Sequence, residues 1–542
     1  MTDTLSTMPI APARDAPGAA PWWLGATIYQ IYPRSFQDSN ADGVGDLPGI
    51  TERLPYVASL GVDGIWISPF FTSPMADFGY DVADFCDVDP IFGSLSDFDA
   101  LIARAHGLGL KVIIDQVYSH TSDQHPWFAQ SRRDRTNPKA DWYVWADPNP
   151  DGTPPNNWQS VFGMGAWQWD ARRRQYYLHN FLVEQPDLNL HNPEVQDAIL
   201  DVTRFWLERG VDGFRLDALN FGMHDRALRD NPVETDPKRP PTRPFDYQRH
   251  TMSMSQPEVV PFIERIRKAI DAAGGTRFTV AEVGGPRPLA EMHLFTQGER
   301  RLNSAYAFDF LYAEQLTAEL VRKTQGEWPG EPGEGWPSWA FENHDAPRAV
   351  TRWRGGVPRD RYAKMLNLLL LSLRGNPILY YGQELGLEQG EIAYQDLQDP
   401  VAITNWPETL GRDGARTPMP WRGDANSHAG FSEARPWLPV QDFHAALSVS
   451  AQDGEPDSVL QFTRAALALR KGCRVLREGA IRFHEAGGLI AFDRVLGGRK
   501  RRCVFNPTQD TLPYDGPMDA ELGVGGIGAV MEPGSGFVSS LS

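Results

Sequence analysis

The 542-residue sequence predicts an α/β protein built on a closed (β/α)8 TIM barrel, with two insertions and a C-terminal antiparallel β-domain. Short apolar segments alternate with helical ones eight times, which is typical of parallel strands joined by helical crossovers. No glycine-rich phosphate loop follows the early strands, so an open, doubly wound sheet is the weaker alternative. From about residue 471 the pattern changes to short alternating runs with glycine-rich turns, which indicates the β-domain.

The first half of the barrel follows a leader, residues 1–20, that is rich in Ala, Pro, Thr and Asp and is expected to be flexible. Helices are predicted at 47–60, entered through Pro48, and at 96–105, where a serine cap precedes apolar residues at helical spacing. The first three strands are predicted over residues 26–32, 62–67 and 110–117. The third is largely apolar, as expected of a buried parallel strand.

The second half begins after residues 119–192, a long segment without an extended helical pattern that we interpret as an inserted subdomain. Asn192 and Pro193 then start a helix that ends at Gly210 and leads into the fourth strand, which ends at Asp217. Four further strands are predicted over 277–282, 304–310, 338–342 and 377–381. The barrel would occupy residues 21–118 and 193–470, with a second insertion at 382–440 after strand eight and the β-domain at 471–542.

The composition limits the classes of partner. A formal net charge of −18 argues against nucleic acid and anionic membranes, and no segment is long and apolar enough to span a bilayer. Cys86, Cys473 and Cys503 are too few and too scattered for a disulfide framework or a metal cluster. The N-terminus lacks the basic start and apolar core of a secretory signal, so we expect a cytoplasmic location. A neutral small-molecule substrate fits this composition. The sequence does not indicate the oligomeric state.

Chemistry is predicted at the carboxyl ends of the strands, where the active sites of TIM barrels lie. Arg215 and Asp217 alternate with Phe214 and Leu216, so the charged pair shares one side of strand four. A cation beside a buried carboxylate favours its ionised form and lowers its pKa. The pair suits either a nucleophile or a structural ion pair.

Two further carboxylates follow other strands, because Glu282 ends the fifth strand and Asp345 follows the seventh. Strands four and five are neighbours, so Asp217 and Glu282 could lie roughly 5–5.5 Å apart, the separation in retaining glycosidases. Asp217 would then be the nucleophile, and Glu282, with its pKa raised by burial, the general acid and base. Asp345 would stabilise positive charge in the transition state. The alternative is that these groups form buried ion pairs that hold the barrel closed.

Several motifs together resemble the α-amylase superfamily, glycoside hydrolase family 13, and within it the α-glucosidase and oligo-1,6-glucosidase branch. They span the chain from about Trp22 to the β-domain and lie at residues 28–36 (IYQIYPRSF), 79–81, 115–120, 185–189, 213–217, 282–283, 343–345 and 412–421. The resemblance implies the same three catalytic residues, Asp217, Glu282 and Asp345. It implies substrate contacts from Tyr80, Asp81, His120, Phe162, Phe181, Arg215, His344 and Arg412.

The resemblance implies an exo-acting, retaining α-glucosidase that releases glucose from the non-reducing end of short α-glucosides, with transglucosylation as a side activity. Asp81 and Arg412 would bind the terminal hydroxyls and close the pocket behind the first sugar. In this branch Val after the nucleophile accompanies α-1,6 specificity and smaller residues α-1,4, so Ala218 favours α-1,4 bonds, as in maltose. The alternatives are a sucrose- or trehalose-acting glucosyltransferase or isomerase and, remotely, a non-catalytic, transporter-associated barrel.

The loop from Asp38 to Asp46 carries oxygen side chains at alternate positions and a glycine at the sixth, which resembles a calcium-binding loop. Its twelfth position is Gly49 rather than Glu, so an EF-hand is not expected. We predict one structural Ca²⁺ or Mg²⁺ and no organic cofactor. The predicted ligands are Asp38, Asn40, Asp42, Asp46 and the Val44 carbonyl. The alternative is an Asx-rich turn without a metal.

Overall fold

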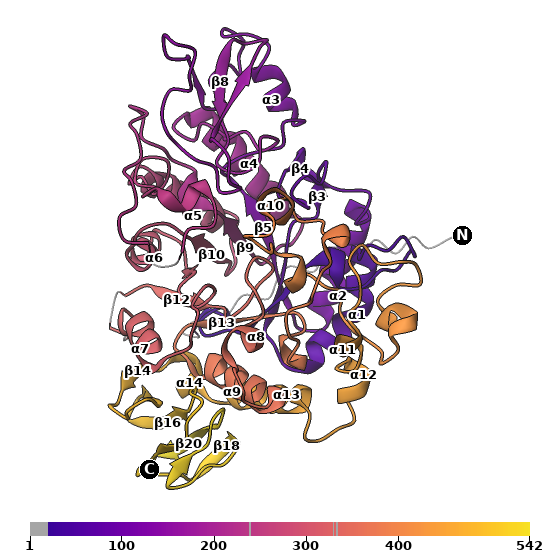
Figure 1. Cartoon of the computed structure of the whole chain (residues 1–542), viewed down its shortest axis with the longest axis vertical. Coiled ribbons are helices and arrows are strands. Elements are labelled where there is room, and N and C mark those ends of the chain that lie inside the picture. Colours follow the sequence, from indigo (N-terminus) through magenta and orange to yellow (C-terminus); the bar gives the residue numbers. More distant parts are fainter. Residues whose placement is uncertain (1–19, 238–239, 329, 332–333, 542) are drawn as a thin grey trace, which may run out of the picture.

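The computed structural model describes residues 20–237, 240–328, 330–331 and 334–541, and a closed barrel of parallel strands forms its centre (Figure 1). The barrel strands are β1 (Ile28–Ile31), β2 (Gly64–Ile67), β5 (Lys111–Val117), β9 (Gly213–Asp217), β10 (Phe278–Val283), β11 (Ser304–Ala307), β12 (Trp336–Trp339) and β13 (Asn376–Tyr380). They follow one another in chain order around the barrel, and β13 pairs with β1. The predicted TIM barrel is confirmed and the open sheet is excluded. The predicted leader lies outside the described residues, except for Ala20.

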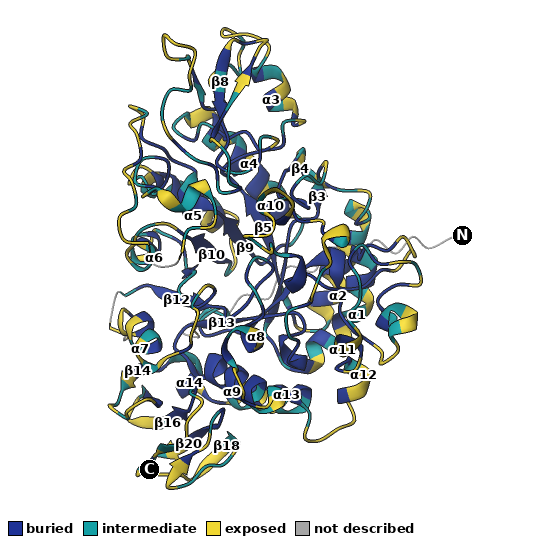
Figure 2. Cartoon of the chain, viewed as in Figure 1, coloured by how far each residue is buried: buried dark blue, intermediate teal, exposed yellow. Residues whose placement is uncertain are grey.

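Helices cover the outside of the barrel, and Figure 2 shows buried strands at the centre with exposed outer helix faces. These helices are α1 (Leu47–Leu60), α2 (Leu95–Gly107), α4 (Pro193–Glu208), α5 (Val259–Ala272), α6 (Pro288–Thr296), α7 (Ala318–Gly326), α8 (Ala349–Trp353), α9 (Arg359–Ser372) and α13 (Val459–Gly472). The predicted start signals are present, because Ser94 forms a capping box with Asp97 and the Asn192 side chain accepts from Glu194 N. Across the described ranges, no helix combines the length and the apolar composition needed to cross a membrane.

Two insertions extend the barrel. The segment between β5 and β9 contains α3 (Pro126–Ser131) and a sheet of β6 (Trp145–Ala146), β8 (Gln175–Leu178) and β7 (Trp167–Asp170), seen at the top of Figure 1. A short pair, β3 (Phe71–Thr72) and β4 (Asp84–Val88), follows β2. After β13 come α10 (Pro400–Asn405), α11 (Asp442–Ala445) and α12 (Val449–Gln452).

The C-terminal part, yellow at the bottom of Figure 1, is antiparallel as predicted. One sheet has the order β14 (Ala480–Phe483), β15 (Ile490–Leu496), β16 (Arg499–Phe505), β20 (Gly536–Leu541) and β18 (Ala520–Val524), and β17 (Leu512–Pro513) pairs with β19 (Val530–Met531). A short helix, α14 (Arg474–Glu478), precedes them and was not predicted.

Strand seven differs from its prediction, because β12 ends at Trp339 instead of residue 342. Beyond the strand, the Asn343 side chain accepts hydrogen bonds from Asp345 N (2.9 Å) and Ala346 N (2.8 Å) and so forms a local turn. Such a side-chain bond replaces the ladder bonds of a strand. Asp345 therefore lies on a loop beyond the strand.

The strand register positions the charged residues at one end of the barrel. Asp115 of β5 pairs with Arg215 of β9, and Leu216 pairs with Ala281 of β10, so Asp217 and Glu282 follow at the same level. Further into the barrel the interior is apolar and includes Ile28, Trp66, Ile113, Val280 and Ile378. The site therefore stands on a packed apolar base at the carboxyl ends of the strands.

Candidate active site

Arg215 is the centre of the site. Its side chain is fully buried, and it forms ion pairs with Asp115 (Nη1 to Oδ1, 2.8 Å), with Asp217 through Nη1 and with Glu282 through Nη2. Tyr306 OH accepts from Arg215 Nη2 (2.9 Å) and donates to Glu282 Oε1 (2.8 Å). One guanidinium therefore holds two of the predicted catalytic carboxylates close together.

The pKa of Asp217 differs in direction from the prediction. Burial raises the pKa of Asp217 to about 7, although Arg215 opposes this change and Asp115 and Asp345 add to it. Arg215 lowers this pKa, as predicted, but the predicted net lowering was wrong, because the effect of burial is larger. Burial also raises the pKa of Glu282 to about 7, as predicted. Two neighbouring carboxyl groups with raised pKa values favour a shared proton near neutral pH.

Asp345 has the opposite electrostatic environment. Burial would raise its pKa, but His344, Arg412 and Arg416 lower it below its usual value. Its oxygens lie 3.0 Å from Arg416 Nη2, 3.3 Å from Arg412 Nη1 and 3.2 Å from His344 Nε2. Burial lowers the pKa of His344 to about 3, so its imidazole is neutral. Asp345 therefore stays ionised across the neutral range, in contrast to Asp217 and Glu282.

Aromatic and imidazole side chains predicted to bind substrate lie around these carboxylates. The Tyr80 and His344 rings stack at 5.4 Å with an interplanar angle of 4°, and Tyr80 OH lies 2.6 Å from His344 Nε2. Phe181 packs between His120 and Phe162, at ring distances of 5.0 and 6.2 Å. These contacts bring the predicted residues of the inserted subdomain to the rim of the barrel.

Asp81 is a correction to the predicted site. Its carboxylate is fully buried and accepts hydrogen bonds from Ser73 Oγ, Ala76 N and Asp77 N, at 2.9, 2.8 and 2.9 Å. These donors belong to its own loop, so Asp81 shapes that loop. Arg412 instead pairs with Asp77, Nη2 to Oδ1 at 2.8 Å, and its guanidinium lies over the Phe162 ring. Asp77 therefore takes the place predicted for Asp81 beside Arg412.

Several residues of the site were not among those predicted. They are Asp77, Asp115, Gln185, Tyr306, Asp399 and Arg416. Asp115 lies near the end of a predicted strand, and Gln185 and Arg416 lie in the family motifs, so each had a signal. Asp399 binds Arg412 through Oδ1 at 2.8 Å but lies in an insertion without a predicted element, where no pattern distinguished it.

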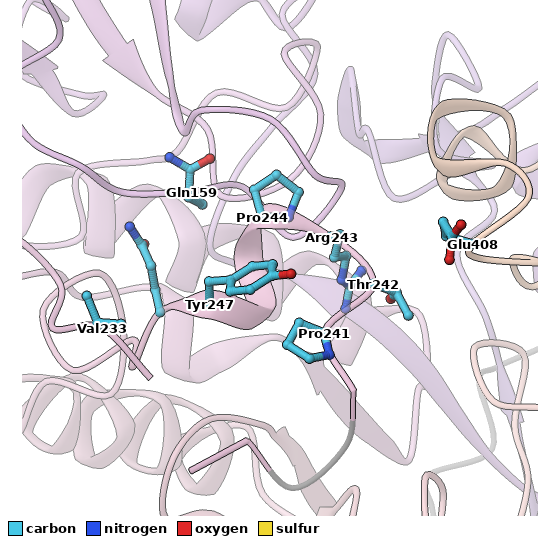
Figure 3. A pocket seen from close by; sticks show the side chains of 9 residues that line it. Gln159, Val233, Pro241, Thr242, Arg243, Pro244, Tyr247 and Glu408 are labelled. Carbon is cyan, nitrogen blue, oxygen red and sulfur yellow. The ribbon is translucent and has the colours of Figure 1, made fainter. Parts of the chain in front are cut away.

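An open groove of about 750 Å³ lies between the two insertions (Figure 3). It is lined by Gln159, Val233, Pro241, Thr242, Arg243, Pro244, Tyr247, Gln248 and Glu408. Gln248 Nε2 donates to Asn157 O at 2.6 Å, and Arg243 Nη1 donates to Val161 O at 2.5 Å. Thr242 Oγ1 lies 3.3 Å from Thr409 Oγ1. Loop 241–248 therefore ties the inserted subdomain to the second insertion, the segments that carry Phe162 and Arg412.

The loop predicted to bind a metal is held by its own hydrogen bonds. Asp38 accepts from Asn40 N, Ala41 N and Gly43 N at 3.0, 2.8 and 2.8 Å. Asp46 accepts from Gly49 N and Ser39 N, at 2.6 and 3.1 Å. Among the described residues, no three Asp, Glu, His or Cys side chains converge in a way that could hold an ion. The Asx-rich turn accounts for this geometry, and the metal stays a prediction.

Metal removal tests that prediction. If one Ca²⁺ or Mg²⁺ binds the loop, dialysis against EDTA should lower the melting temperature and added Ca²⁺ should restore it. An ion at 100 times its Kd contributes about 2.7 kcal/mol to the free energy of unfolding. Asp42→Asn keeps the acceptor for Val44 N but removes a charged ligand, so its response to EDTA should be smaller. Elemental analysis that finds no divalent ion per chain would contradict the prediction.

The geometry defines a class of protein: a TIM-barrel enzyme whose site combines two protonatable carboxylates on one arginine with a third, ionised carboxylate. A family model described as the alpha amylase catalytic domain matches residues 30–479. A probable alpha-glucosidase of Rhizobium meliloti (strain 1021) is 52% identical over 551 residues, which cover 100% of this chain and 96% of the relative. An oligo-1,6-glucosidase of Heyndrickxia coagulans is 35% identical, covering 92% of this chain and 94% of the relative.

Solved structures of similar proteins have the same overall fold as this chain. The alpha-glucosyl transfer enzyme XgtA has a TM-score of 0.91 and 51% identity, covering 96% of this chain and 100% of that one. The isomaltulose synthase from Erwinia rhapontici NX5 has a TM-score of 0.86 and 30% identity, covering 96% and 99%. The chain belongs to the α-amylase family, glycoside hydrolase family 13, and to its α-glucosidase and oligo-1,6-glucosidase branch. It is a glycoside hydrolase.

Proposed function

We propose that the protein is an exo-acting, retaining α-glucosidase that cleaves terminal, non-reducing α-1,4 bonds of short α-glucosides. The observation that carries the proposal is the pair Asp217 and Glu282 on the single cation Arg215. Retaining enzymes need two carboxyl groups close together, one ionised and one protonated. The raised pKa values of this pair, to about 7, favour that state near neutral pH.

The reaction has two steps. The Asp217 carboxylate attacks the anomeric carbon, the bond from that carbon to the leaving oxygen breaks, and Glu282 gives its proton to the leaving oxygen. Water then attacks the same carbon and gives a proton to Glu282, which breaks the ester bond and releases glucose and free Asp217. An alcohol in place of water gives transglucosylation. Asp345, kept ionised by its cations, stabilises the positive charge of both transition states.

The ion cluster around Arg412 supports exo action, because it would close the site behind one sugar. Arg412 pairs with Asp77 of the loop after β3 and with Asp399 of the second insertion, both at 2.8 Å, and reaches Asp345 at 3.3 Å. A chain passing through the site would have to displace this buried ion cluster. Glucose at the end of a chain needs no such displacement.

A sucrose-acting glucosyltransferase or isomerase is the second candidate, favoured by the structural likeness to isomaltulose synthases and to the alpha-glucosyl transfer enzyme XgtA. All these reactions share the first step, so the carboxylates do not distinguish them. The non-catalytic alternative is opposed by the presence of all three carboxylates in one site.

Initial rates on maltose, isomaltose and sucrose test the proposal. Maltose should be the best of the three, and NMR should detect α-glucose as the first product. Conversion of sucrose into an isomer with little free glucose would favour the second candidate. Faster cleavage of isomaltose than of maltose would show that the inference from Ala218 is wrong.

The matched variants change only residue 218. Ala218 has a left-handed backbone, with φ of 42°, and follows the proposed nucleophile. Ala218→Val places a β-branched side chain beside the scissile bond, so we expect the maltose-to-isomaltose ratio of kcat/KM to fall roughly tenfold. Ala218→Ser is the small-residue control and should keep the ratio. An unchanged ratio in Ala218→Val would contradict a role of this residue in linkage specificity.

A further inference from the structure

A buried polar network lies behind the two proposed catalytic carboxylates. Asn220 belongs to the 3-10 turn Leu219–Phe221 that follows Asp217 and is 1% exposed. Its Nδ2 donates to Gly284 O at 3.0 Å, and Gly284 is two residues beyond Glu282. The network therefore joins the loop after β9 to the loop after β10.

Glu291 of α6 closes this network. Its Oε2 accepts from Ser255 Oγ at 2.9 Å and lies 3.5 Å from Asn220 Nδ2. Ser255 N donates to Asn220 O at 2.7 Å, so the serine is bound to both partners. The Glu291 carboxylate is buried, with 6% of the residue exposed. One carboxylate oxygen on α6, the helix that follows β10, thus binds two side chains of the segment that follows β9.

The backbone around the network leaves little room for movement. A Cβ at Gly285 would lie 3.0 Å from Met254 Cε, 3.1 Å from Ser255 Oγ and 3.4 Å from Asn220 Nδ2. Ala218 and Ser255 both have positive φ, 42° and 61°, which non-glycine residues adopt at a cost. The surrounding contacts must hold these conformations in place.

We propose that Glu291 is a positioning residue that fixes the loops of Asp217 and Glu282 relative to each other through Asn220 and Ser255. The proposal rests on the proposed function, because it assigns these two carboxylates to the chemistry. Within the described part of the chain, Glu291 hydrogen-bonds Ser255 and Asn220 and contacts neither carboxylate, so it acts through the loops. Burial raises the pKa of Glu291 to about 7, and Gln can therefore replace its protonated form.

Glu291→Ala and Glu291→Gln test the proposal. Loss of the carboxyl group should lower kcat on maltose roughly tenfold to a hundredfold with KM within about twofold, because a misplacement of 1 Å can cost about 10²-fold in rate. It should also shift the basic limb of the pH profile of kcat/KM, since the separation of Asp217 and Glu282 sets their pKa values. Glu291→Gln keeps an acceptor for Ser255 and should restore both quantities.

Glu384→Ala is the matched control. Glu384 is also a buried glutamate with a raised pKa, but it accepts from Tyr29 OH and Tyr56 OH, both at 2.8 Å. This variant should lose stability and keep the pH profile, with rates corrected for the folded fraction by circular dichroism.

The possible outcomes distinguish a failure of the proposed function from a failure of the positioning role. A wild type that does not act on α-glucosides refutes the proposed function whatever the variants do. With an active wild type, wild-type kcat and pH profile in Glu291→Ala would overturn the positioning role alone. A uniform rate loss with an unshifted pH profile would overturn it as well, in favour of a structural role.

Discussion

Replacing Asp217 with asparagine is expected to lower kcat on α-glucosides by roughly 10⁴-fold or more, the scale seen when a nucleophile is removed. The amide has nearly the same shape but cannot form the ester with the sugar. Arg215 keeps Asp115 and Glu282 as partners, so the barrel should stay folded. Initial rates on p-nitrophenyl α-glucoside measure the loss. Asp170→Asn, which changes a buried carboxylate paired with Arg132 in the inserted subdomain, should keep near-normal rates.

The stability of the same variant distinguishes a nucleophile from a structural ion pair. The pKa of Asp217 is raised to about 7, so between about pH 4 and pH 7 the folded state binds more protons than the unfolded state. Wild-type stability contributed by this group is therefore present below pH 4 and is lost as pH rises through 7. Asp217→Asn removes that loss and should melt higher than the wild type at pH 8, with the difference vanishing near pH 4. A variant that melts lower at every pH would show that the pair mainly holds the barrel closed.

The barrel could be predicted because its evidence is local. The eight apolar segments and the helices between them are predicted from the periodicity of side chains within each segment. The helix starts are predicted from caps such as Ser94 and Asn192, which bond to the backbone within a few residues. The end of β12 at Trp339 could not be predicted, because Ala340 and Phe341 continue the apolar run beyond it. Helix α14 is five residues long, too short for a periodic pattern.

The sequence predicted which residues form the site better than it predicted how they interact with one another. Asp217, Glu282 and Arg215 are in place, yet the direction of the Asp217 pKa shift depends on its burial in the fold. Asp115, a residue 102 positions away that shares Arg215, adds to that shift. Arg412 selects Asp77 over Asp81, four residues apart, because the fold of loop 73–81 turns Asp81 inward. Neither the pKa shift nor the choice of Asp77 can be predicted from the neighbouring sequence, since both depend on which strands and loops come into contact.

Glu282→Gln is expected to separate the proton-transfer role from the rest of the site. Without the acid, maltose hydrolysis should fall by about 10²- to 10⁴-fold, because the sugar leaving oxygen needs a proton. The leaving group of α-glucosyl fluoride needs none. Asp217 should still displace fluoride once per molecule of enzyme, and the glucosyl-enzyme should then accumulate because water lacks its base. A fluoride burst and a mass increase of the protein measure this intermediate.

The pH profile completes the argument for Glu282. Its pKa is raised to about 7 by burial, so in the wild type kcat/KM for maltose should fall as pH rises through the region where the pair loses its shared proton. The first step of Glu282→Gln with α-glucosyl fluoride should lack this basic limb. Glu384→Gln, a buried glutamate held by two tyrosines where Glu282 is held by one, should keep the limb and the maltose activity. Persistence of the limb in Glu282→Gln would assign the acid to another group. Asp115, whose pKa burial raises to about 6, would be the next carboxyl group to replace.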